Sequence, residues 1–440
     1  MVDKGRRWVK LRDVCEVFDG PHATPKKTFA GPLFLGISSL SRGRLELSQS
    51  EHLSEHDFAR WTRRVQPRAG DVVFSYETRL GEAAIIPDGL RCCLGRRMGL
   101  LRPEPSKVMP RFLLYSYLSP AFQEVLRKHT VQGSTVERIL LSELPNFSIQ
   151  IPLLAEQENI AQFLGALDDK IELNWRMNET LEALARAIFK SWFVDFEPVH
   201  AKMDGRWRRG QSLPGLPANL YDLFPDSFED AALGKIPKGS SAKVLPDACE
   251  INPTRSLPAG SEAPYLDMAN MPTRSARALG WINRRFTSGM KFICGDTLVA
   301  RITPCLENGK TAFVDFLGEG QVGWGSTEYI VLRSKPPLPL EYSYFLARSD
   351  DFRAHAIANM TGTSGRQRVP PDCLKRFGVV IPPKPVAAEF GKLAHTTMLS
   401  IRAHEEESRT LAAIRDALLP KLISDEIRVT AAQELVAHEA

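Results

Sequence analysis

The 440-residue chain lacks the features that mark exported or membrane-spanning proteins. Its first residues, MVDKGRRWVKLRD, contain no apolar signal core, and no run of about 18 apolar residues occurs in the sequence. The seven cysteines form no C-x-x-C pair, which favours reduced thiols over a disulfide framework. These absences predict a cytoplasmic protein.

Signatures of catalysis are also missing from the sequence. The tripeptide GKT at 309–311 resembles the end of a phosphate-binding loop, but Pro304 stands where that loop requires its first glycine. The F-x-G-x-G run at 316–320 has the form of an S-adenosylmethionine loop, yet a predicted strand follows it where a helix is needed, and no N-P-P-[YF] element is present. His52 and His56 have no evident third ligand and predict a solvated polar face. We therefore predict that the chain is not an enzyme and holds no metal or cofactor of its own.

The composition is that of an ordinary folded protein, with 43% hydrophobic and 25% charged residues. A chain of this length exceeds the size of a single hydrophobic core, so we expect two or more domains. The formal net charge of +5 is compatible with a polyanionic partner.

The most informative feature present is an internal repeat with an offset of roughly 230 residues, far longer than a solenoid period. Five pairs of similar segments follow one another in the same order. They are LRDVCE and LPDACE (from 11 and 245), GDVVFS and GDTLVA (from 70 and 295), YSYL and YSYF (from 115 and 342), LPNFSIQIP and LKRFGVVIP (ending at 152 and 382), and LEALARAIFKSWF and LAAIRDALLPKLI (from 181 and 411). The predicted order is globule, helix, globule, helix.

Each globule mixes short β-rich runs, separated by glycine and proline turns, with helical stretches at 110–129 and 341–359. After each globule, apolar residues recur three and four apart, as in a coiled-coil seam. The seam residues are Ile160, Leu164, Leu167, Ile171, Leu181, Ala185, Ile188 and Trp192, then Phe390, Ala394, Ile401, Leu411, Leu418 and Leu422. Two ordinary amphipathic helices are the alternative, but two equal helices can cover each other. We predict an α+β fold with two repeated domains separated by two long antiparallel coiled-coil helices with pseudo-two-fold symmetry.

Polar residues interrupt both stripes at matching places, Asn174 and Asn178 in the first helix and His404 and Ser408 in the second. The segment between the copies is rich in proline, glycine and charge and is interpreted as a linker. The predicted parts are a first domain (1–152), a first long helix (153–196), the linker (197–235), a second domain (236–382), a second long helix (383–424) and a C-terminal tail (425–440).

Arginine clusters in both globules predict contacts with DNA, because a guanidinium group can bind guanine edges or phosphates. A solvated face or a bias toward arginine is the alternative for any one cluster. The segments GSTVER and GTSGRQR occupy matching places before the two IP elements, which favours a shared role. The predicted DNA-binding residues are Arg63, Arg64, Arg96, Arg97, Ser134, Thr135, Arg138, Arg284, Arg301, Lys310, Thr363, Arg366 and Arg368.

The segment QENIAQFLGALDDKIELNWRMNETLEALARAIFKSWFVDF, at 157–196, closely resembles the central conserved region of the specificity subunits of Type I restriction-modification enzymes. LLPKLISDEIRV at 418–429 resembles their distal conserved region, and PDSFEDAALGKIPKG resembles the start of their second repeat. TPCLENGK and GSTEYIVLR look like parts of their target-recognition domains. The resemblance covers essentially the whole chain and departs at Ser240, where that family commonly has tryptophan.

This resemblance implies two target-recognition domains, each reading one half of a bipartite sequence in double-stranded DNA. It also implies that two modification subunits, which bind S-adenosylmethionine and methylate adenine, dock on the long helices. Restriction subunits that use ATP and Mg would add cleavage. The residues expected at the partner contacts are Leu181, Phe189, Trp192, Phe193, Leu418 and Leu422.

Two other functions remain open at this point. A stand-alone methyltransferase is disfavoured by the missing N-P-P-[YF] element. A two-module DNA-binding regulator or a scaffold without a methyltransferase partner fits the repeat but not the specific match of the helix.

Overall fold

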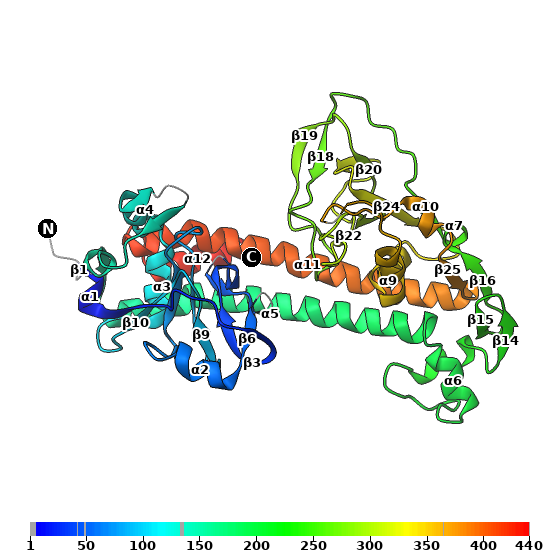
Figure 1. Cartoon of the computed structure of the whole chain (residues 1–440), viewed down its shortest axis with the longest axis horizontal. Coiled ribbons are helices and arrows are strands. Elements are labelled where there is room, and N and C mark those ends of the chain that lie inside the picture. Colours follow the sequence, from blue (N-terminus) through cyan, green and yellow to red (C-terminus); the bar gives the residue numbers. More distant parts are fainter. Residues whose placement is uncertain (1–5, 42, 48–49, 133–135, 364, 440) are drawn as a thin grey trace. The chain divides into compact units, whose positions relative to one another are not determined.

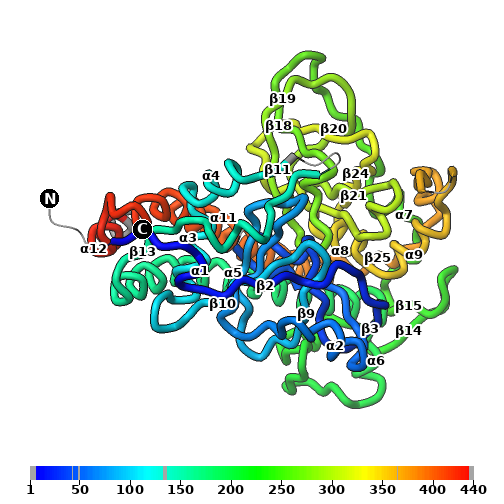
Figure 2. The backbone as a smooth tube through the Cα atoms, turned by 60° about the vertical axis from the view of Figure 1, so that its left-hand side comes forward, coloured from blue at the N-terminus to red at the C-terminus, as the bar shows by residue number. Residues whose placement is uncertain are grey.

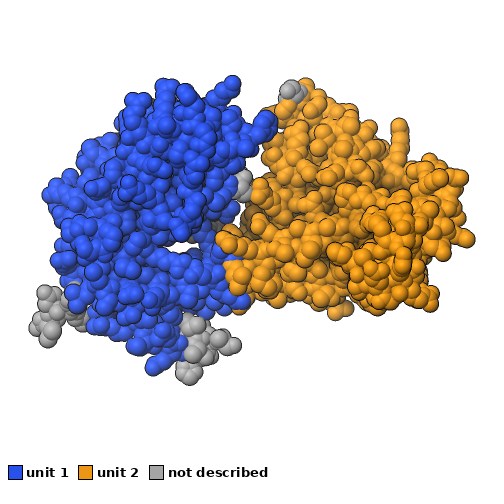
Figure 3. Space-filling model, turned by 90° about the horizontal axis from the view of Figure 1, so that it is seen from below, with its two compact units in different colours: residues 1–172, 408–440 blue, residues 173–407 orange. Residues whose placement is uncertain are grey.

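The computed structural model describes residues 6–41, 43–47, 50–132, 136–363 and 365–439. The chain divides into two compact units, shown in different colours in Figure 3. Unit 1 comprises residues 1–172 and 408–440, and unit 2 comprises residues 173–407. Each unit contains one copy of the repeat and part of each long helix, so the boundary between units falls within the helices and not at their ends.

The first copy pairs its strands into a central antiparallel sheet, a smaller sheet that we call the outer sheet, and a two-stranded ladder. The strands are β1 (Arg7–Lys10), β2 (Cys15–Asp19), β3 (Lys27–Leu35), β6 (Glu51–Leu53), β7 (Val72–Ser75), β8 (Ala83–Ile85), β9 (Cys92–Leu94), β10 (Met98–Pro103) and β13 (Ser148–Ile151). The central sheet has the order β2-β10-β7-β8, the outer sheet β6-β3-β9 and the ladder β1-β13. In the outer sheet β3 and β9 are parallel.

The second copy repeats this arrangement. Its strands are β16 (Ser241–Val244), β17 (Cys249–Ile251), β18 (Glu262–Leu266), β19 (Ile282–Arg285), β20 (Met290–Phe292), β21 (Thr297–Ala300), β22 (Thr311–Phe313), β23 (Gly323–Gly325), β24 (Tyr329–Ser334) and β25 (Gly378–Ile381). The orders are β17-β24-β21-β22, β19-β18-β23-β20 and β16-β25, again with one parallel pair, β18 with β23. Figure 2 shows β18, β19 and β20 grouped together. Apart from the additional β20, the strands of these three sheets correspond in the two copies, which confirms the predicted α+β repeat.

The GDVVFS and GDTLVA segments each begin a central strand with a buried aspartate. Asp71 accepts the backbone N–H of Arg68 at 2.8 Å and pairs with Arg102 on the neighbouring strand at 2.7 Å. Asp296 accepts the equivalent turn bond at 2.9 Å and pairs with Arg333 at 2.7 Å. The carboxylate thus closes the turn and neutralises a neighbouring cation, so this part of the repeat stabilises the fold.

A pair of short helices packs on each central sheet. They are α3 (Pro110–Leu118) and α4 (Pro120–Lys128) in the first copy, and α8 (Tyr342–Arg348) and α9 (Asp350–Ala358) in the second. Ser119 and Ser349 stand between the helices of each pair, and each hydroxyl accepts a backbone N–H of the next helix as an N-cap. The YSYL and YSYF segments therefore form helices that end at a capping serine.

The two long helices in Figure 1 are α5 (Leu154–Phe193) and α11 (Lys384–Ile423). Most of the predicted seam residues on both helices are buried, whereas Leu181, Ile188 and Leu411 are half-buried. Within each unit, the buried seam residues form part of the hydrophobic core of that unit. The predicted pair of long helices is confirmed.

The polar residues that interrupt the seam contact each other within unit 2. Asn178 donates from Nδ2 to the carbonyl of Ile401 at 3.3 Å, and its Oδ1 lies 2.8 Å from Nδ1 of His404. Asn174 donates to Oε2 of Glu407 at 2.8 Å. Residue numbers rise along α5 as they fall along α11, so the helices are antiparallel here. Buried polar pairs of this kind fix the register of a coiled coil.

The prediction that residues 197–235 form a linker is wrong. The segment contains α6 (Glu197–Met203), a 3-10 helix η4 (Ala218–Leu223), β14 (Phe228–Ala231) and the start of β15 (Gly234–Pro237). Trp207 is 1% exposed, and its ring lies 6.2 Å from that of Phe224, which in turn lies 4.9 Å from Trp192 of α5. Burial of these large aromatic side chains outweighs the local effect of proline and glycine.

The predicted C-terminal tail is likewise structured, since α12 (Val429–Glu439) packs Ala432 into the core of unit 1. The remaining short elements are α1 (Leu11–Val14), α2 (Glu55–Trp61), α7 (Leu245–Ala248), α10 (Pro371–Leu374), β4 (Leu40–Ser41), β5 (Arg44–Leu45), β11 (Thr130–Gln132) and β12 (Glu137–Ile139). Within the described ranges, no helix has the length and apolar character needed to cross a bilayer.

Candidate nucleic-acid interface

In the first copy, three chain segments meet where the central strand β7 ends. The N–H of Tyr76 donates to the carbonyl of Arg97 at 3.3 Å, and the carbonyl of Tyr76 accepts the N–H of Ile139 at 2.9 Å. Glu77 and Arg138 then face each other in an isolated antiparallel bridge. The Glu77 carboxylate pairs with Arg97, Nε to Oε1, at 3.0 Å. Two of the predicted arginines therefore share one backbone framework.

The second copy builds the same framework after β21. The N–H of Arg301 donates to the carbonyl of Glu328 at 2.9 Å, and its carbonyl accepts the N–H of Val369 at 2.8 Å. Ile302 and Arg368 form the matching antiparallel bridge. Arg368 binds Glu328 through Nε and Nη2, both at 2.8 Å from Oε1, and this hydrogen bonding raises the pKa of Arg368. The guanidinium is therefore charged and held at a fixed place.

The two frameworks carry different side chains on equivalent backbones. Arg97 and Glu328 occupy the same place with opposite charge, and Ile302 replaces Glu77. The arginine of the GSTVER and GTSGRQR segments is common to both copies. A shared scaffold with exchanged charges can hold two surfaces that recognise different partners.

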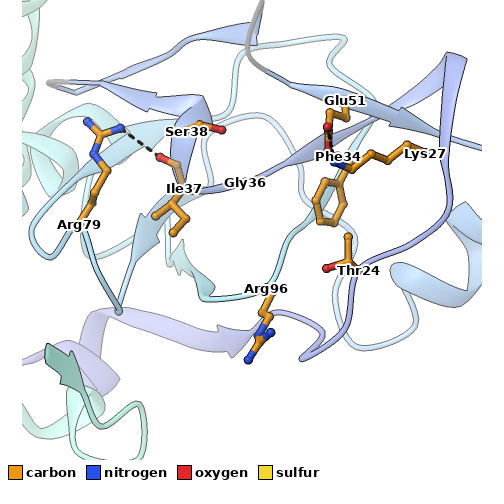
Figure 4. Close-up of a pocket in the computed structure, with 9 residues that line it drawn as sticks. All are labelled: Thr24, Lys27, Phe34, Gly36, Ile37, Ser38, Glu51, Arg79 and Arg96. Carbon is orange, nitrogen blue, oxygen red and sulfur yellow. Dashed lines mark hydrogen bonds and ion pairs between the residues drawn. The ribbon is translucent and has the colours of Figure 1, made fainter. Parts of the chain in front are cut away.

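Of the other predicted residues of the first copy, Arg96 lines an open hollow of about 490 Å³ in unit 1. Figure 4 shows its lining, in which Lys27 and Glu51 point toward each other and Arg79 points toward the carbonyl of Ile37, with Arg96 nearby. Arg63 and Arg64 are exposed on another part of the surface, and Arg64 donates to the carbonyl of Gly20 at 3.3 Å. Ser134 and Thr135 lie outside the described residues.

Lys27 and Arg79 were not predicted from the sequence. Lys27 belongs to an isolated Lys-Lys pair at the start of β3, and Arg79 follows β7 in the loop that also carries Glu77. Position after a central strand was the signal that could have identified Arg79, because Arg301 stands at the end of the equivalent strand.

In the second copy the predicted residues differ in their freedom to contact a ligand. Arg284 is exposed on β19 with its guanidinium carbon 5.0 Å from the Tyr265 ring centroid. Thr363 and Arg366 are also exposed. Lys310 is half-buried and its ammonium donates to a backbone carbonyl, which favours a role in holding its loop.

A buried ionic cluster supports that loop from below. Arg348 donates from Nη1 to the carbonyls of Thr273 and Gly309, both at 2.8 Å, and its Nη2 lies 3.6 Å from Glu182 of α5. Burial raises the pKa of Glu182, while Tyr344 donates a hydrogen bond that opposes the shift. The loop before Lys310 is thereby anchored to a long helix.

The predicted partner-binding residues are in the wrong place for that role. Phe189, Trp192 and Phe193 are buried in the core of unit 2, and Leu418 and Leu422 are buried in the core of unit 1. The sixth, Leu181, is half-buried against the core of unit 2. The seam is covered by the chain's own domains, so it offers little surface to another protein.

Exposed apolar residues of α5 occupy another face. Leu173 is 51% exposed, Met177 39% and Leu184 56%. Their spacing of four and seven residues places the three side chains on one side of the helix. This exposed face, unlike the seam, is an apolar surface that is open to another protein.

Among the described residues, no group of three or more histidine, cysteine, aspartate or glutamate side chains is arranged to hold a metal ion. The buried thiols of Cys92 and Cys93 have their pKa raised to about 12 by burial and stay protonated near neutral pH. The strongest polar features are therefore the two arginine frameworks and the hollow.

Residues 6–183 match the family described as Type I restriction modification DNA specificity domain. The chain is 24% identical over 416 residues to the Type I restriction enzyme HindI specificity subunit of Haemophilus influenzae, covering 82% of this chain and 87% of that protein. It is also 24% identical over 438 residues to the Type I restriction enzyme MjaIX specificity subunit of Methanocaldococcus jannaschii, covering 96% and 93%.

The crystal structure of the S subunit of a Type I restriction-modification system from M. genitalium has a similar fold, with a TM-score of 0.51. At 14% identity it covers 96% of this chain and 97% of that one. The matched specificity domain includes the first copy, and the relatives align along most of the chain. The fold is shared with the solved S subunit. These findings agree with the duplicated framework. Residues 6–183 thus match a Type I restriction modification DNA specificity domain, and most of the chain is similar to specificity subunits of Type I restriction enzymes.

Proposed function

We propose that this chain is the DNA-recognition subunit of a Type I restriction-modification complex and reads a bipartite target, one half with each copy of the repeat. The observation that supports this most is the duplicated framework at the ends of β7 and β21, with Arg138 and Arg368 at equivalent places and exchanged charges around them. Two similar scaffolds with different side chains suit two different half-sites in DNA.

We further propose that the chain is non-catalytic and acts in the cytoplasm with two modification subunits and with restriction subunits. The modification subunits would supply S-adenosylmethionine binding, and the restriction subunits ATP and Mg. The exposed face formed by Leu173, Met177 and Leu184 is our candidate for their docking surface, in place of the buried seam. Apolar side chains rimmed by polar residues are typical of such contacts.

Co-expression with a Type I modification subunit tests the proposal. We expect adenine methylation at a motif with two specified halves separated by unspecified bases, and none from either protein alone. Sequencing that detects methylated adenine in the host genome gives the motif directly. Methyl transfer by the purified chain without a partner would contradict the non-catalytic role.

A stand-alone DNA-binding regulator would behave differently in the same experiment. It would bind DNA with similar affinity with or without the modification subunit, and no methylated motif would appear. Gel filtration of the mixture distinguishes this outcome further, because a regulator would not form a stable complex with that subunit.

Alanine at Arg366 is expected to weaken DNA binding of the assembled complex by roughly 5- to 150-fold if its exposed guanidinium reads a base. A phosphate contact would give a milder loss and lower the slope of log affinity against log salt by about one. Titration of labelled DNA at several salt concentrations measures both quantities. Arg209, exposed and paired with Asp222 in the 197–235 segment, is the matched control. Unchanged affinity and slope in Arg366→Ala would remove it from the interface.

A further inference from the structure

Two arginines outside the predicted site occupy the same place in the two copies. Arg44 lies in the connection between β3 and β6, and Arg277 lies in the connection between β18 and β19. These strand pairs are equivalent, since β3 and β18 each pair antiparallel with the next strand of their outer sheet along the chain and parallel with a later one, β9 or β23. Each arginine therefore comes from the connection that joins two strands of an outer sheet.

In unit 1, Arg44 reaches from this connection to α5. Its Nη2 donates to the main-chain carbonyl of Asp168 at 3.0 Å and lies 3.6 Å from the carboxylate of the same residue. Its Nη1 lies 3.7 Å from Oε2 of Glu172, one turn further along the helix. The side chains of Arg44 and Asp168 are 15% and 21% exposed, whereas that of Glu172 is 42% exposed, so one side of this contact is open to water.

In unit 2, Arg277 reaches α11 in the same way. Its Nη1 donates to the main-chain carbonyl of Arg402 at 3.4 Å and to Glu405 at 3.2 Å, and its Nη2 lies 3.9 Å from Glu406. Its Nε also pairs with Asp315 at 2.6 Å. The side chain is 3% exposed, which makes this the more deeply buried of the two contacts.

The partners on the helices are of the same kinds but stand one helical turn apart in the repeat, because Asp168 follows Pro152 by 16 residues and Arg402 follows Pro382 by 20. The arginine and the carbonyl that it binds are 124 residues apart in the first copy and 125 in the second. Glu172 and Glu406 follow their respective carbonyl residues by one helical turn. The agreement in donor, main-chain acceptor and carboxylate indicates the same kind of anchor in both copies.

An anchor of this kind can set the angle between an outer sheet and its long helix, which apolar packing alone does not fix. Hydrophobic burial is non-directional, whereas a guanidinium fork bonded to a carbonyl and a carboxylate fixes both distance and orientation. The outer sheets held in this way carry Lys27 on β3 and the exposed Arg284 on β19. The direction in which those side chains face depends on the angle of the sheet to its helix.

We propose that Arg44 and Arg277 are equivalent positioning residues that fix each outer sheet on its long helix and thereby select the spacer length between the two half-sites. This inference rests on the proposed function, because it needs a bipartite target. Neither arginine has to touch DNA. Loss of an anchor should leave the bases read by each domain unchanged and relax the choice of spacer.

The experiment uses the complex of this chain with its modification subunit and a library of targets in which the two half-sites are separated by the native spacer or by one or two bases more or fewer. The variants are Arg44→Met, which keeps the aliphatic stem, and Arg277→Lys, which keeps a charge beside Asp315 and Glu405. Arg209→Met is the control. We expect the preference for the native spacer to fall about tenfold in both variants, the effect of losing one charge-assisted hydrogen bond.

Sequencing of the methylated products reports half-site sequence and spacer separately, and circular dichroism reports folding. A purely structural role would lower methylation of all targets equally and leave the spacer preference intact, and that result would overturn the proposal. So would folded variants indistinguishable from Arg209→Met. Failure of the proposed function is recognised independently, because the unaltered chain would then methylate no bipartite target with its partner.

Discussion

Replacing Asp296 with alanine is expected to lower the free energy of unfolding of unit 2 by about 3–5 kcal/mol, the cost of removing one partner of a buried ion pair. Asp296 is fully buried, and its carboxylate lies 2.7 Å from Arg333 and 3.3 Å from Arg255. Without it, two largely buried guanidinium groups lose a shared anion. Urea unfolding followed by circular dichroism measures the shift.

Two further variants make the result specific. Asp71→Ala removes the equivalent carboxylate of unit 1 and should destabilise that unit instead. Asp372→Ala breaks an ion pair with Lys375 in which both side chains are exposed, and it should leave the unfolding curve unchanged. If Asp296→Ala behaved like Asp372→Ala, the GD segments would not be the stabilising elements of the repeat.

Inserting one heptad into both long helices, after Glu172 in α5 and after Glu407 in α11, is expected to change the spacing of the half-sites in the proposed bipartite target. Both positions lie at the boundary between the units and leave the contacts among Asn174, Asn178 and His404 in place. Seven residues keep the seam in phase and lengthen each helix by about 10 Å, close to three base pairs of DNA. The methylated motif should keep both half-site sequences and gain up to three unspecified bases, as sequencing of methylated DNA would reveal.

Methylation by this insertion variant should also be weaker. Three additional base pairs rotate the second half-site by about 100° around the duplex, which the partner subunits must accommodate. A heptad placed in α5 alone is the control, because it puts the α11 residues out of register and should abolish activity. Normal methylation at the original spacing by the doubly extended chain would show that the helices do not set that distance.

The sequence was sufficient to predict the duplicated α+β domains and the two long helices, because both depend on local patterns. Strand and turn residues recur in the same order in the two copies, and the spacing of Ile160, Leu164 and Leu167 is that of a buried helical stripe. The capping serines, Ser119 and Ser349, are equally local signals. Features of this kind are fixed by neighbours a few residues away.

Features that depend on distant contacts were not predictable. The segment around Trp207 has the composition of a linker, and its burial against Phe224 and Trp192 follows from tertiary packing alone. The same limitation explains the error over Trp192 as a partner contact, since an apolar helix residue can face either its own core or another protein. The pattern cannot distinguish the two.

The arginine clusters show why the candidate site was only partly predictable. Sequence marks Arg97, Arg366 and Arg368 equally, yet the structure pairs Arg97 with Glu77 and Arg368 with Glu328 and leaves Arg366 exposed. These partners come from separate loops and turns, so no spacing along the chain reveals them. The DNA-binding role of these residues remains a prediction, and we expect the exposed Arg366 to contribute differently to DNA binding from the paired Arg97 and Arg368.

The packed segment between the copies also limits where an exchange between related genes would leave the fold intact. A crossover within the codons for residues 193–224 would separate Trp192 from Phe224 and combine aromatic side chains whose volumes were not selected together. A crossover at the turn of the β14-β15 hairpin, residues 231–234, would keep Trp192 with Phe224, but the contacts of Phe193 with Tyr342 and Phe390 would still cross the junction. Exchange of the second copy at that hairpin should therefore be tolerated best when the incoming chain keeps aromatic side chains at these two positions.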